Sequence, residues 1–357
     1  MKNFSIIIGV VLVVLLGSTS CKNMKNNTES DNVAVEQPIG PQFNADSAYF
    51  FCAQQCEFGP RIMNSDAHDK CEQWIADKFR QYGCQVKLQK ADVTGYDGTV
   101  LHATNIMASF RPEATTRILI CAHWDSRPWA DNDPDEKNHR TPVMAANDGA
   151  SGVAVMIELA RLLCENQSAD NDTTRIETES AKAEEVAGLL PLNKNIGIDF
   201  VCFDAEDWGT PQWAEETTGD TWALGAQYFA THLPDGYEAR YGILLDMVGG
   251  EGAQFYKEYM SNQYAPAIVD KVWAAAQAAG YGNFFPNSMG AGVTDDHIPL
   301  NQKARIPTID IISYYPDCQQ SSFGPTWHTI SDTMDHIDKR TLKAVGQTLI
   351  QVLYTEE

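Results

Sequence analysis

Acidic and imidazole side chains of the kinds that bind metal ions occur in short stretches that lie far apart in this sequence. These candidate residues are His123, Asp125, Asp148, Glu206, Asp207, Asp246 and His328. Most of them follow an apolar run that is typical of a buried strand. Because ligands collect at the carboxyl ends of strands in an α/β sheet, we expect these side chains to converge on one ion.

Three of these residues form a plausible zinc set. Zinc takes imidazole nitrogen and carboxylate oxygen, and a catalytic zinc keeps one position open for water or substrate. Asp148, Asp207 and His328 would supply three ligands, and His123 and Asp246 could supply more. No Cys-x-x-Cys pair is present, so a thiolate zinc site is not expected.

Two acidic residues next to this set have separate predicted tasks. Successive residues at a strand end point in opposite directions, so Asp207 can bind the ion while Glu206 faces the substrate as general base. Asp125 lies two residues after His123 and could orient its imidazole. Taken singly, Asp148 could be a helix cap and Asp207 part of a turn. Five histidines are interpreted as ordinary surface or core residues: His68, His102, His139, His232 and His336.

The elements that must position these residues alternate between strands and helices. Strands are predicted at 86–93, 105–110, 117–122, 196–203, 241–248 and 308–312, and helices at 46–58, 67–82, 151–163, 223–232, 262–279 and 339–354. This order predicts one α/β domain with a mixed, mostly parallel central sheet flanked by helices. The alternating run 86–93 suits a sheet edge, and the acidic segment 167–192 is expected to be a surface insertion.

The N-terminal residues have the pattern of an export signal. A short basic start precedes the apolar run 6–16, and small residues then precede Cys21. This pattern predicts a lipoprotein signal peptide at 1–20, a lipid on Cys21, a flexible tether at 21–43 and an enzyme domain at 44–357. We therefore expect an exported, membrane-tethered lipoprotein in the periplasm or outer membrane. An ordinary signal peptide cut nearby and an uncleaved anchor are the alternatives.

Charge and cysteine content restrict the partners. The formal net charge of -22 argues against nucleic acid and against anionic membrane, so membrane attachment is expected only through Cys21. Nine cysteines in an exported chain permit disulfides, but their pairing does not follow from the sequence. Cys121 and Cys202 lie in apolar runs and are expected to pack as small hydrophobic residues.

Five motifs in this order carry a resemblance to a known family. They are AHWDSRP at 122–128, NDGASG at 147–152, DAED at 204–207, DDHIP at 295–299 and PTWHT at 325–329. The chain resembles the zinc aminopeptidase superfamily, with its phosphorylase/hydrolase-like fold. Within that superfamily it is similar to the bacterial glutaminyl cyclases, or glutaminyl-peptide cyclotransferases, from about Asn44 to the C-terminus, apart from the acidic insertion.

The resemblance implies a role for each matching residue. Asp148, Asp207 and His328 would hold a single zinc ion per chain, and Glu206 would shuttle a proton. Many relatives carry glutamate where this chain has Asp207, so its shorter side chain must bring the backbone closer to the ion or shift the ion.

The resemblance also implies the residues around the substrate. Asp246 and Asp296 would pair by a shared proton near the leaving group. Trp327 would wall the pocket together with a tryptophan that follows the acidic pair, and Trp208 and Trp213 are both candidates for it.

The activity that the resemblance implies is cyclisation of the N-terminal glutamine of peptides or proteins to pyroglutamate, with release of ammonia. A two-zinc aminopeptidase is the main alternative, because its full ligand set is present: His123, Asp148, Asp207, Asp246 and His328. A tethered binding protein that has lost activity is a third possibility. The sequence leaves open the natural substrates and the oligomeric state.

Overall fold

The computed structural model describes residues 38–173, 191–214 and 220–357, with side chains left out for 168–173. The described residues belong to one compact unit. The predicted signal peptide, most of the predicted tether and most of the predicted insertion lie outside the described residues. None of the described helices is both long and apolar enough to cross a membrane.

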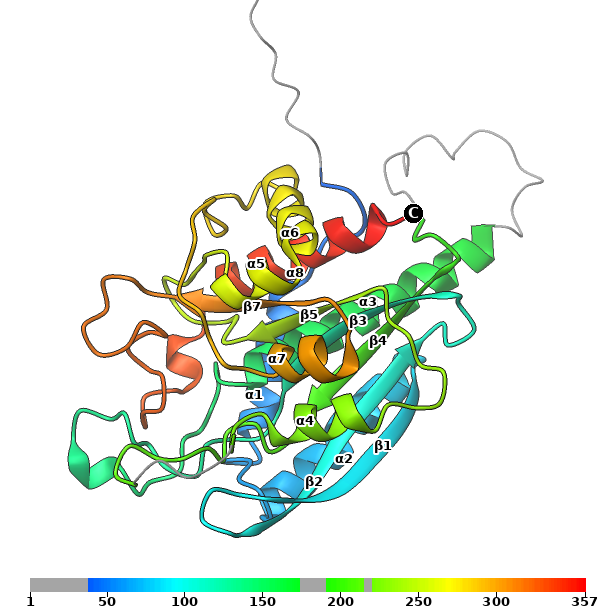
Figure 1. The fold of residues 1–357 in the computed structure, drawn as a ribbon. Coiled ribbons are helices and arrows are strands. Elements are labelled where there is room, and N and C mark those ends of the chain that lie inside the picture. The colour runs from blue at the N-terminus through cyan, green and yellow to red at the C-terminus, as the bar shows by residue number, and fades with distance from the viewer. Residues whose placement is uncertain (1–37, 174–190, 215–219) are drawn as a thin grey trace, which may run out of the picture. The chain divides into compact units, whose positions relative to one another are not determined.

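Within the described residues, seven strands form one sheet in the order β1-β2-β4-β3-β5-β7-β6 (Figure 1). The strands are β1 (Gln85–Thr94), β2 (Val100–Phe110), β3 (Thr116–His123), β4 (Ile196–Phe203), β5 (Tyr241–Asp246), β6 (Gln254–Phe255) and β7 (Thr308–Tyr314). The central strands β4, β3, β5 and β7 are parallel, and antiparallel strands lie at both edges. The predicted mixed α/β sheet is confirmed, and β1 lies at an edge as expected.

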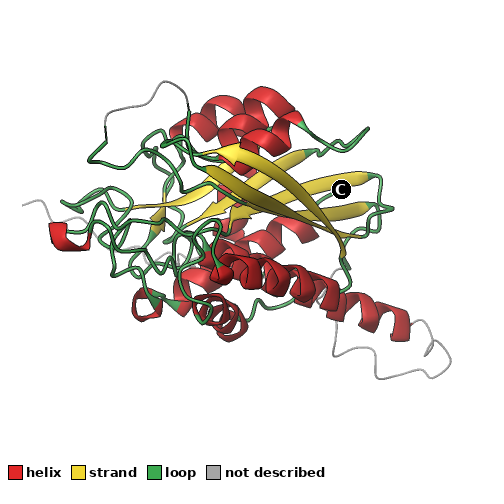
Figure 2. Cartoon of the chain, turned by 90° about the horizontal axis from the view of Figure 1, so that it is seen from below, coloured by secondary structure: helices red, strands yellow, loops and turns green. Residues whose placement is uncertain are grey.

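Helices cover both faces of the sheet (Figure 2). They are α1 (Ala45–Cys56), α2 (Asp66–Gln81), α3 (Ala150–Thr173), α4 (Leu224–Thr231), α5 (Tyr259–Tyr264), α6 (Pro266–Ala278), α7 (His297–Pro299) and α8 (Lys339–Tyr354). Short helical turns lie at Glu136–Asn138, Leu300–Ala304 and Met334–His336.

Strand β3 shows how the two faces are filled. Ile118 and Ile120 belong to a core shared with α1, α2, α3, α6 and α8. Leu119 and Cys121 point the other way, into a core shared with α4 and with Leu300 after α7. Successive side chains of a strand point to opposite faces, so an unbroken apolar run is what a strand covered on both faces requires.

Two predicted helices differ from the observed ones. The predicted helix 262–279 is two helices, because Ala265 precedes Pro266 and has backbone angles outside the helical region (φ -139°, ψ 53°). Proline drives the preceding residue out of the helical region and then suits the first position of the next helix. Helix α3 runs on to Thr173, into the predicted insertion, since adding a residue to an existing helix costs less than starting one.

The first described residues are fixed to the last helix. The backbone N–H groups of Ile39 and Phe43 donate to Gln351 and Gln347 of α8 at 2.8 and 2.9 Å. A Cβ at Gly346 of α8 would overlap the ring of Phe43, so this glycine permits the contact. The described cysteines form no disulfide with one another, and Cys121 and Cys202 are buried in their strands as predicted.

Candidate active site

The predicted ligands converge at the carboxyl ends of the central strands. His123 is the last residue of β3 and Asp246 the last of β5, and the pair Glu206 and Asp207 follows β4. Asp148 lies just before α3. All five are nine-tenths or more buried. The loop before α8 adds His328, which is also buried.

One group of three residues fits a zinc ion. Asp148, Asp207 and His328 each offer a ligand atom, and these atoms all lie within 4.8 Å of one another. His328 Nε2 is 3.2 Å from Asp207 Oδ1 and 3.5 Å from Asp148 Oδ2. Asp207 Oδ2 is buried and has no hydrogen-bond partner among the described residues. Carboxylate oxygen and imidazole nitrogen are donors that zinc prefers. A buried carboxylate oxygen without a hydrogen-bond partner is a further sign that an ion belongs here.

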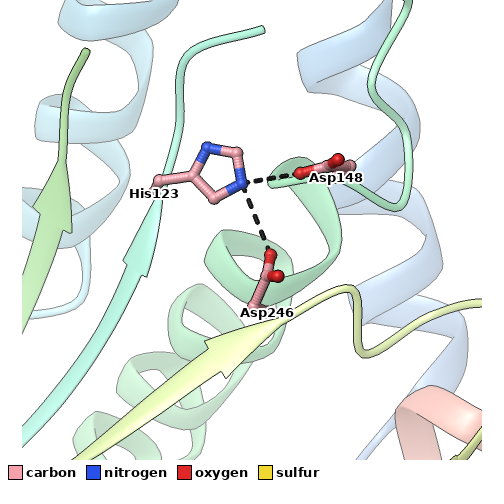
Figure 3. Close-up of side chains that lie close together, drawn as sticks. All are labelled: His123, Asp148 and Asp246. Carbon is pink, nitrogen blue, oxygen red and sulfur yellow. Dashed lines mark hydrogen bonds and ion pairs between the residues drawn. The ribbon is translucent and has the colours of Figure 1, made fainter. Parts of the chain in front are cut away.

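A second group shares Asp148. His123 Nε2 lies 2.9 Å from Asp148 Oδ1 and 3.4 Å from Asp246 Oδ1 (Figure 3). These three residues also have ligand atoms within 4.8 Å of one another. Asp148 therefore belongs to both groups, as a bridging ligand would.

Asp125 and Asp332 hold the backbone beside the candidate ligands. The carboxylate of Asp125 accepts the N–H groups of Glu206 and Asp207, both at 3.1 Å. Its Oδ1 is also 3.4 Å from His123 Nδ1, where it can orient that ring as predicted. Asp332, which the sequence analysis missed, accepts the N–H groups of Asn147 and Asp148 at 2.8 and 3.1 Å.

Backbone strain collects at this site. Ala205, Met247 and His328 are non-glycine residues with left-handed φ values of 52°, 48° and 54°. Such conformations cost free energy and persist only where the surroundings impose them. Here they occur directly before Glu206, directly after Asp246 and at the candidate ligand His328 itself.

Arg127 forms the other side of the candidate metal group. It is 1% exposed, and its guanidinium donates to both carboxylate oxygens of Asp131 at 2.7 Å. The same guanidinium donates to the backbone oxygen of Asp207 at 3.1 Å and to its Oδ1 at 3.3 Å. Asp131 Oδ1 lies 3.6 Å from His328 Nδ1. The sequence analysis quoted Arg127 in a motif but gave it no role.

A cavity of about 280 Å³ opens beside these groups. Asp148 and His328 lie on its wall together with Glu206, Asp246 and Asp295. Its apolar wall comes from Met247, Val293, Ile312, Phe323, Trp222 and Trp327. The Trp327 ring stacks on the His328 imidazole with ring centroids 3.8 Å apart. The position predicted for Trp327 at the pocket therefore agrees with the structure.

The second tryptophan of the wall is Trp222, and neither Trp208 nor Trp213 lines this cavity. Trp208 packs against Gly95 of the β1–β2 turn, where a Cβ would overlap its ring. Trp213 stacks under Arg140 at 3.8 Å. The prediction placed the wall too close to the acidic pair in sequence, because the chain makes a further excursion before it returns to the site at Trp222.

No hydrogen bond joins Asp246 to Asp296 among the described residues, and the proton predicted to be shared between them stays a prediction. Both carboxylate oxygens of Asp296 lack a hydrogen-bond partner among the described residues, and its side chain does not line the cavity. Asp295 lines it beside Asp246 instead.

Burial and mutual repulsion raise the pKa values of the cavity carboxylates. Burial, and then the charge of Asp246, raises the pKa of Asp295 to about 7. Burial raises the pKa of Asp246 to about 6, with the neighbouring Asp148 adding to the effect. Burial also raises the pKa of Glu206 well above its ordinary value. Crowded buried carboxylates of this kind need protons or a cation to balance their charge.

A second buried polar cluster lies behind Asp295. His297 Nε2 is 3.4 Å from Glu258 Oε2, and His297 Nδ1 is 3.9 Å from Asp310 Oδ2. Asp295, His297 and Asp310 have ligand-type atoms within 4.8 Å of one another. The sequence analysis missed Glu258 and Asp310, although an acidic residue inside the apolar strand run at 308–312 was a visible signal.

Comparison with known proteins places this geometry in a family. The sequence profile of peptidase family M28 matches residues 105–353. A solved structure of Bacteroides thetaiotaomicron glutaminyl cyclase is 48% identical, with a TM-score of 0.79 over 89% of this chain and 100% of that one. A structure described as a leucine aminopeptidase precursor from the same species is also 48% identical, with a TM-score of 0.77 over 89% of this chain and 99% of that one.

Sequence relatives agree with the structural ones. The glutaminyl-peptide cyclotransferase of Gloydius blomhoffii is 24% identical over 268 residues, which is 71% of this chain. The chain spans 40% to 65% of the length of the first curated relatives that it matches. The resemblance inferred from the motifs is confirmed, as is the zinc aminopeptidase-like fold. The chain belongs to peptidase family M28, and its structural relatives include bacterial glutaminyl cyclases and zinc-dependent exopeptidases.

Proposed function

We propose that this protein is a glutaminyl-peptide cyclotransferase, which converts the N-terminal glutamine of peptides or proteins to pyroglutamate and releases ammonia. One observation carries the proposal. Glu206 lines the tryptophan-walled cavity, whereas its neighbour Asp207 lies against His328. Two adjacent carboxylates with separate surroundings can hold an ion with one and move a proton with the other.

One zinc ion per chain would be held by Asp148, Asp207 and His328, and it would supply Lewis-acid polarisation of the substrate's side-chain amide carbonyl. The chain's own residues perform the proton transfers. Glu206 would accept a proton from the α-amine as the amine nitrogen attacks the amide carbon, and would then give that proton to the departing ammonia. Asp246 and Asp295 line the same cavity and would bind the leaving nitrogen.

The cavity suits a reaction within one molecule. A glutamine side chain must fold back on its own amine, and a wall of Trp222 and Trp327 favours this compact shape while excluding water. Cyclisation requires no water nucleophile, so exclusion of water from the cavity does not impede it. The same exclusion suppresses hydrolysis of the side-chain amide.

A two-zinc aminopeptidase remains the second candidate, and a specific observation favours it. His123, Asp148 and Asp246 form a second group with ligand atoms within 4.8 Å, so Asp148 could bridge two ions. In that reading Glu206 would activate a bridging water, and the products would be a free amino acid and a shortened peptide.

Incubation with a glutamine-initiated peptide separates the candidates. Ammonia together with a blocked N-terminus supports the cyclase, and free glutamine supports the aminopeptidase. Neither product, with zinc bound, would indicate a binding protein. Zinc content gives an independent measure, since about one ion per chain fits the cyclase and about two fit the peptidase.

The location of the enzyme is part of the proposal. The signal-like segment at 1–20 and Cys21 support an exported lipoprotein that is tethered through a lipid. Its substrates would then be exported proteins whose processing exposes glutamine. Labelling of the cells with a lipid precursor, followed by recovery of the labelled protein from membranes, tests the tether; a Cys21→Ser variant should lose the label.

A further inference from the structure

Arg127 touches both the candidate metal group and the wall of the substrate cavity. Its guanidinium donates to the backbone oxygen and to Oδ1 of Asp207, at 3.1 and 3.3 Å. The same guanidinium lies over the ring of Trp222, with its carbon 4.7 Å from the ring centroid. A planar guanidinium can do both at once, because its edge donates hydrogen bonds while its face stacks on an aromatic ring.

The surroundings of Arg127 fix it in this place. Both carboxylate oxygens of Asp131 accept from it at 2.7 Å, in the bidentate geometry that orients a guanidinium most strictly. Both side chains of this pair are at least 98% buried. Because Asp131 holds the buried guanidinium in place, a displacement of Arg127 would disturb its contacts with both Asp207 and Trp222.

Trp222 is packed against the same segment of chain. A Cβ at Gly209 would overlap the Trp222 ring, and the backbone oxygen of Gly209 also accepts from Arg127 at 3.5 Å. The ring lies nearly parallel to the His328 imidazole, with an interplanar angle of 7° and centroids 6.0 Å apart. The position of the Trp222 ring in the cavity wall therefore depends on the segment 207–209.

We propose that Arg127 is a positioning residue that couples the metal site to the substrate pocket, by holding the Asp207 carboxylate and the Trp222 ring as one unit. It rests on the proposed function in that Asp207 is taken as a zinc ligand. It also accounts for the short aspartate at this position, because Asp125 and Arg127 between them hold the N–H and the C=O of Asp207 and so fix the backbone beside the ion.

The main test compares two lysine substitutions. Arg127→Lys keeps the charge but loses the planar fork and the stacking face. Arg117→Lys is the matched control, because Arg117 makes a similar but partly buried pair with Asp199 at 2.9 and 2.5 Å, near the other end of β3. The measurements are the zinc dissociation constant by competition with a chelating dye, KM and kcat for a glutamine peptide, and Tm.

We expect Arg127→Lys to weaken zinc binding by about 10- to 100-fold, the usual cost of removing a residue that orients a metal ligand. KM should rise several-fold in the zinc-saturated variant, because the Trp222 wall loses its support. Arg117→Lys should lower Tm and leave the zinc affinity and KM unchanged. The proposal is overturned if Arg127→Lys keeps the wild-type zinc affinity and KM, or if the two variants change them equally.

A second measurement needs no Arg127 variant, in case that variant does not fold. Zinc is titrated into the metal-free wild-type protein and into Trp222→Phe while tryptophan fluorescence is followed. A zinc-dependent change that is present in the wild type and lost in Trp222→Phe supports the coupling, and identical changes in both proteins contradict it. This readout involves no turnover, so a wild-type protein that fails to cyclise glutamine would defeat the proposed function without deciding the coupling.

Discussion

Glu206 and its neighbour Asp207 are adjacent carboxylates whose surroundings differ. Asp207 contacts Arg127 and His328, whereas Glu206 makes no side-chain hydrogen bond within the described residues and lines the cavity. Burial raises the pKa of Glu206 well above its ordinary value, as a group that must both take and give a proton requires. The separation of tasks for this pair stays a prediction, and these positions leave Glu206 free to face a substrate while Asp207 lies beside His328.

Glu206→Gln should keep zinc and lose turnover. The amide retains the shape of the side chain but cannot carry a proton, so kcat should fall by about 10²- to 10⁴-fold. Zinc content and Tm should remain those of the wild type. Ammonia release and metal analysis on the same preparation check this, and unchanged kcat would remove Glu206 from the role.

Asp295 and Asp296 offer a direct comparison of two adjacent aspartates. Asp295 lines the cavity with its pKa raised by burial to about 7, whereas Asp296 is fully buried away from it. We expect Asp295→Asn to lower kcat at least tenfold, by the reasoning for general acid–base groups. Asp296→Asn should have a much smaller effect on kcat, because the Asp296 side chain does not line the cavity. Equal losses would favour the original assignment of Asp296.

For single residues, the sequence indicated which side chains gather at the site, but not which of them face the cavity. Glu206 and Asp207 follow the end of β4, as the strand pattern predicted, whereas Asp148 and His328 reach the same place from loops before α3 and α8. Which of Asp295 and Asp296 faces the cavity depends on the turn into a three-residue helix, which leaves no periodic signal. Trp222 lies 15 residues beyond Asp207, in a polar stretch whose path no local pattern encodes.

Glu258 is a titratable residue that caps the N-terminus of helix α5. Its carboxylate accepts the N–H groups of Met260 and Val293 at 2.8 and 2.9 Å and faces His297 at 3.4 Å. Although burial alone would raise the pKa of Glu258, the contact with His297 and the hydrogen bonds from Ser261 lower it to about 2, from an ordinary value of 4.5.

Because the pKa of Glu258 is lower in the folded state, its contribution to stability is present above pH 4.5 and is lost as the pH falls toward 2. Glu258→Gln should therefore destabilise the protein at pH 7, by about 2 kcal/mol. The difference from wild type should shrink progressively below pH 4.5. Urea denaturation of both proteins across this range measures it, and a difference that is independent of pH would contradict it.

Gly346 in α8 gives a prediction in which two effects oppose each other. Alanine normally stabilises a helix interior by about 1 kcal/mol over glycine. Here the new Cβ would overlap the Phe43 ring, and overpacking of this kind costs about 1–3 kcal/mol. We expect Gly346→Ala to lower Tm. Adding Phe43→Leu should recover part of the loss, and a Gly346→Ala protein as stable as the wild type would show that the N-terminal segment yields easily.

The elements themselves were predicted more reliably than the side-chain directions. The buried strands β3, β4 and β5 have mostly apolar runs, and helices α2 and α8 have clear amphipathic periods. Pro266 was a visible signal for the break at Ala265. The apolar period continues on both sides of it, however, and therefore predicted a single helix. Strand β6 has two residues, Gln254 and Phe255, and forms only because β7 offers an edge.

On the scale of the whole molecule, the site concentrates negative charge in a chain whose net charge is already -22. Bound zinc would relieve the repulsion among Asp148, Asp207 and their acidic neighbours. A ligand that binds only the folded state raises stability by about 2.7 kcal/mol at roughly a hundred times its dissociation constant. Removal of metal with a chelator should therefore lower Tm, and zinc should restore it.

Asp148→Asn is the control for that measurement, because it removes a ligand shared by both candidate groups. Its Tm should respond weakly to chelator or zinc. In the metal-free wild type, added salt should raise Tm, since screening reduces the repulsion between the charges. A Tm that is the same with and without metal would contradict a zinc ion in this place.

The attachment of residues 39–43 to α8 has a consequence for biosynthesis. Helix α8 supplies Leu342, Val345, Leu349 and Val352 to the main core, and it also receives the first described residues. As the ribosome releases the chain from its N-terminus, the early segments must wait for residue 354 before their final partner exists. This order of events would suit the export proposed above, because translocation through a narrow pore requires a chain that has not yet folded.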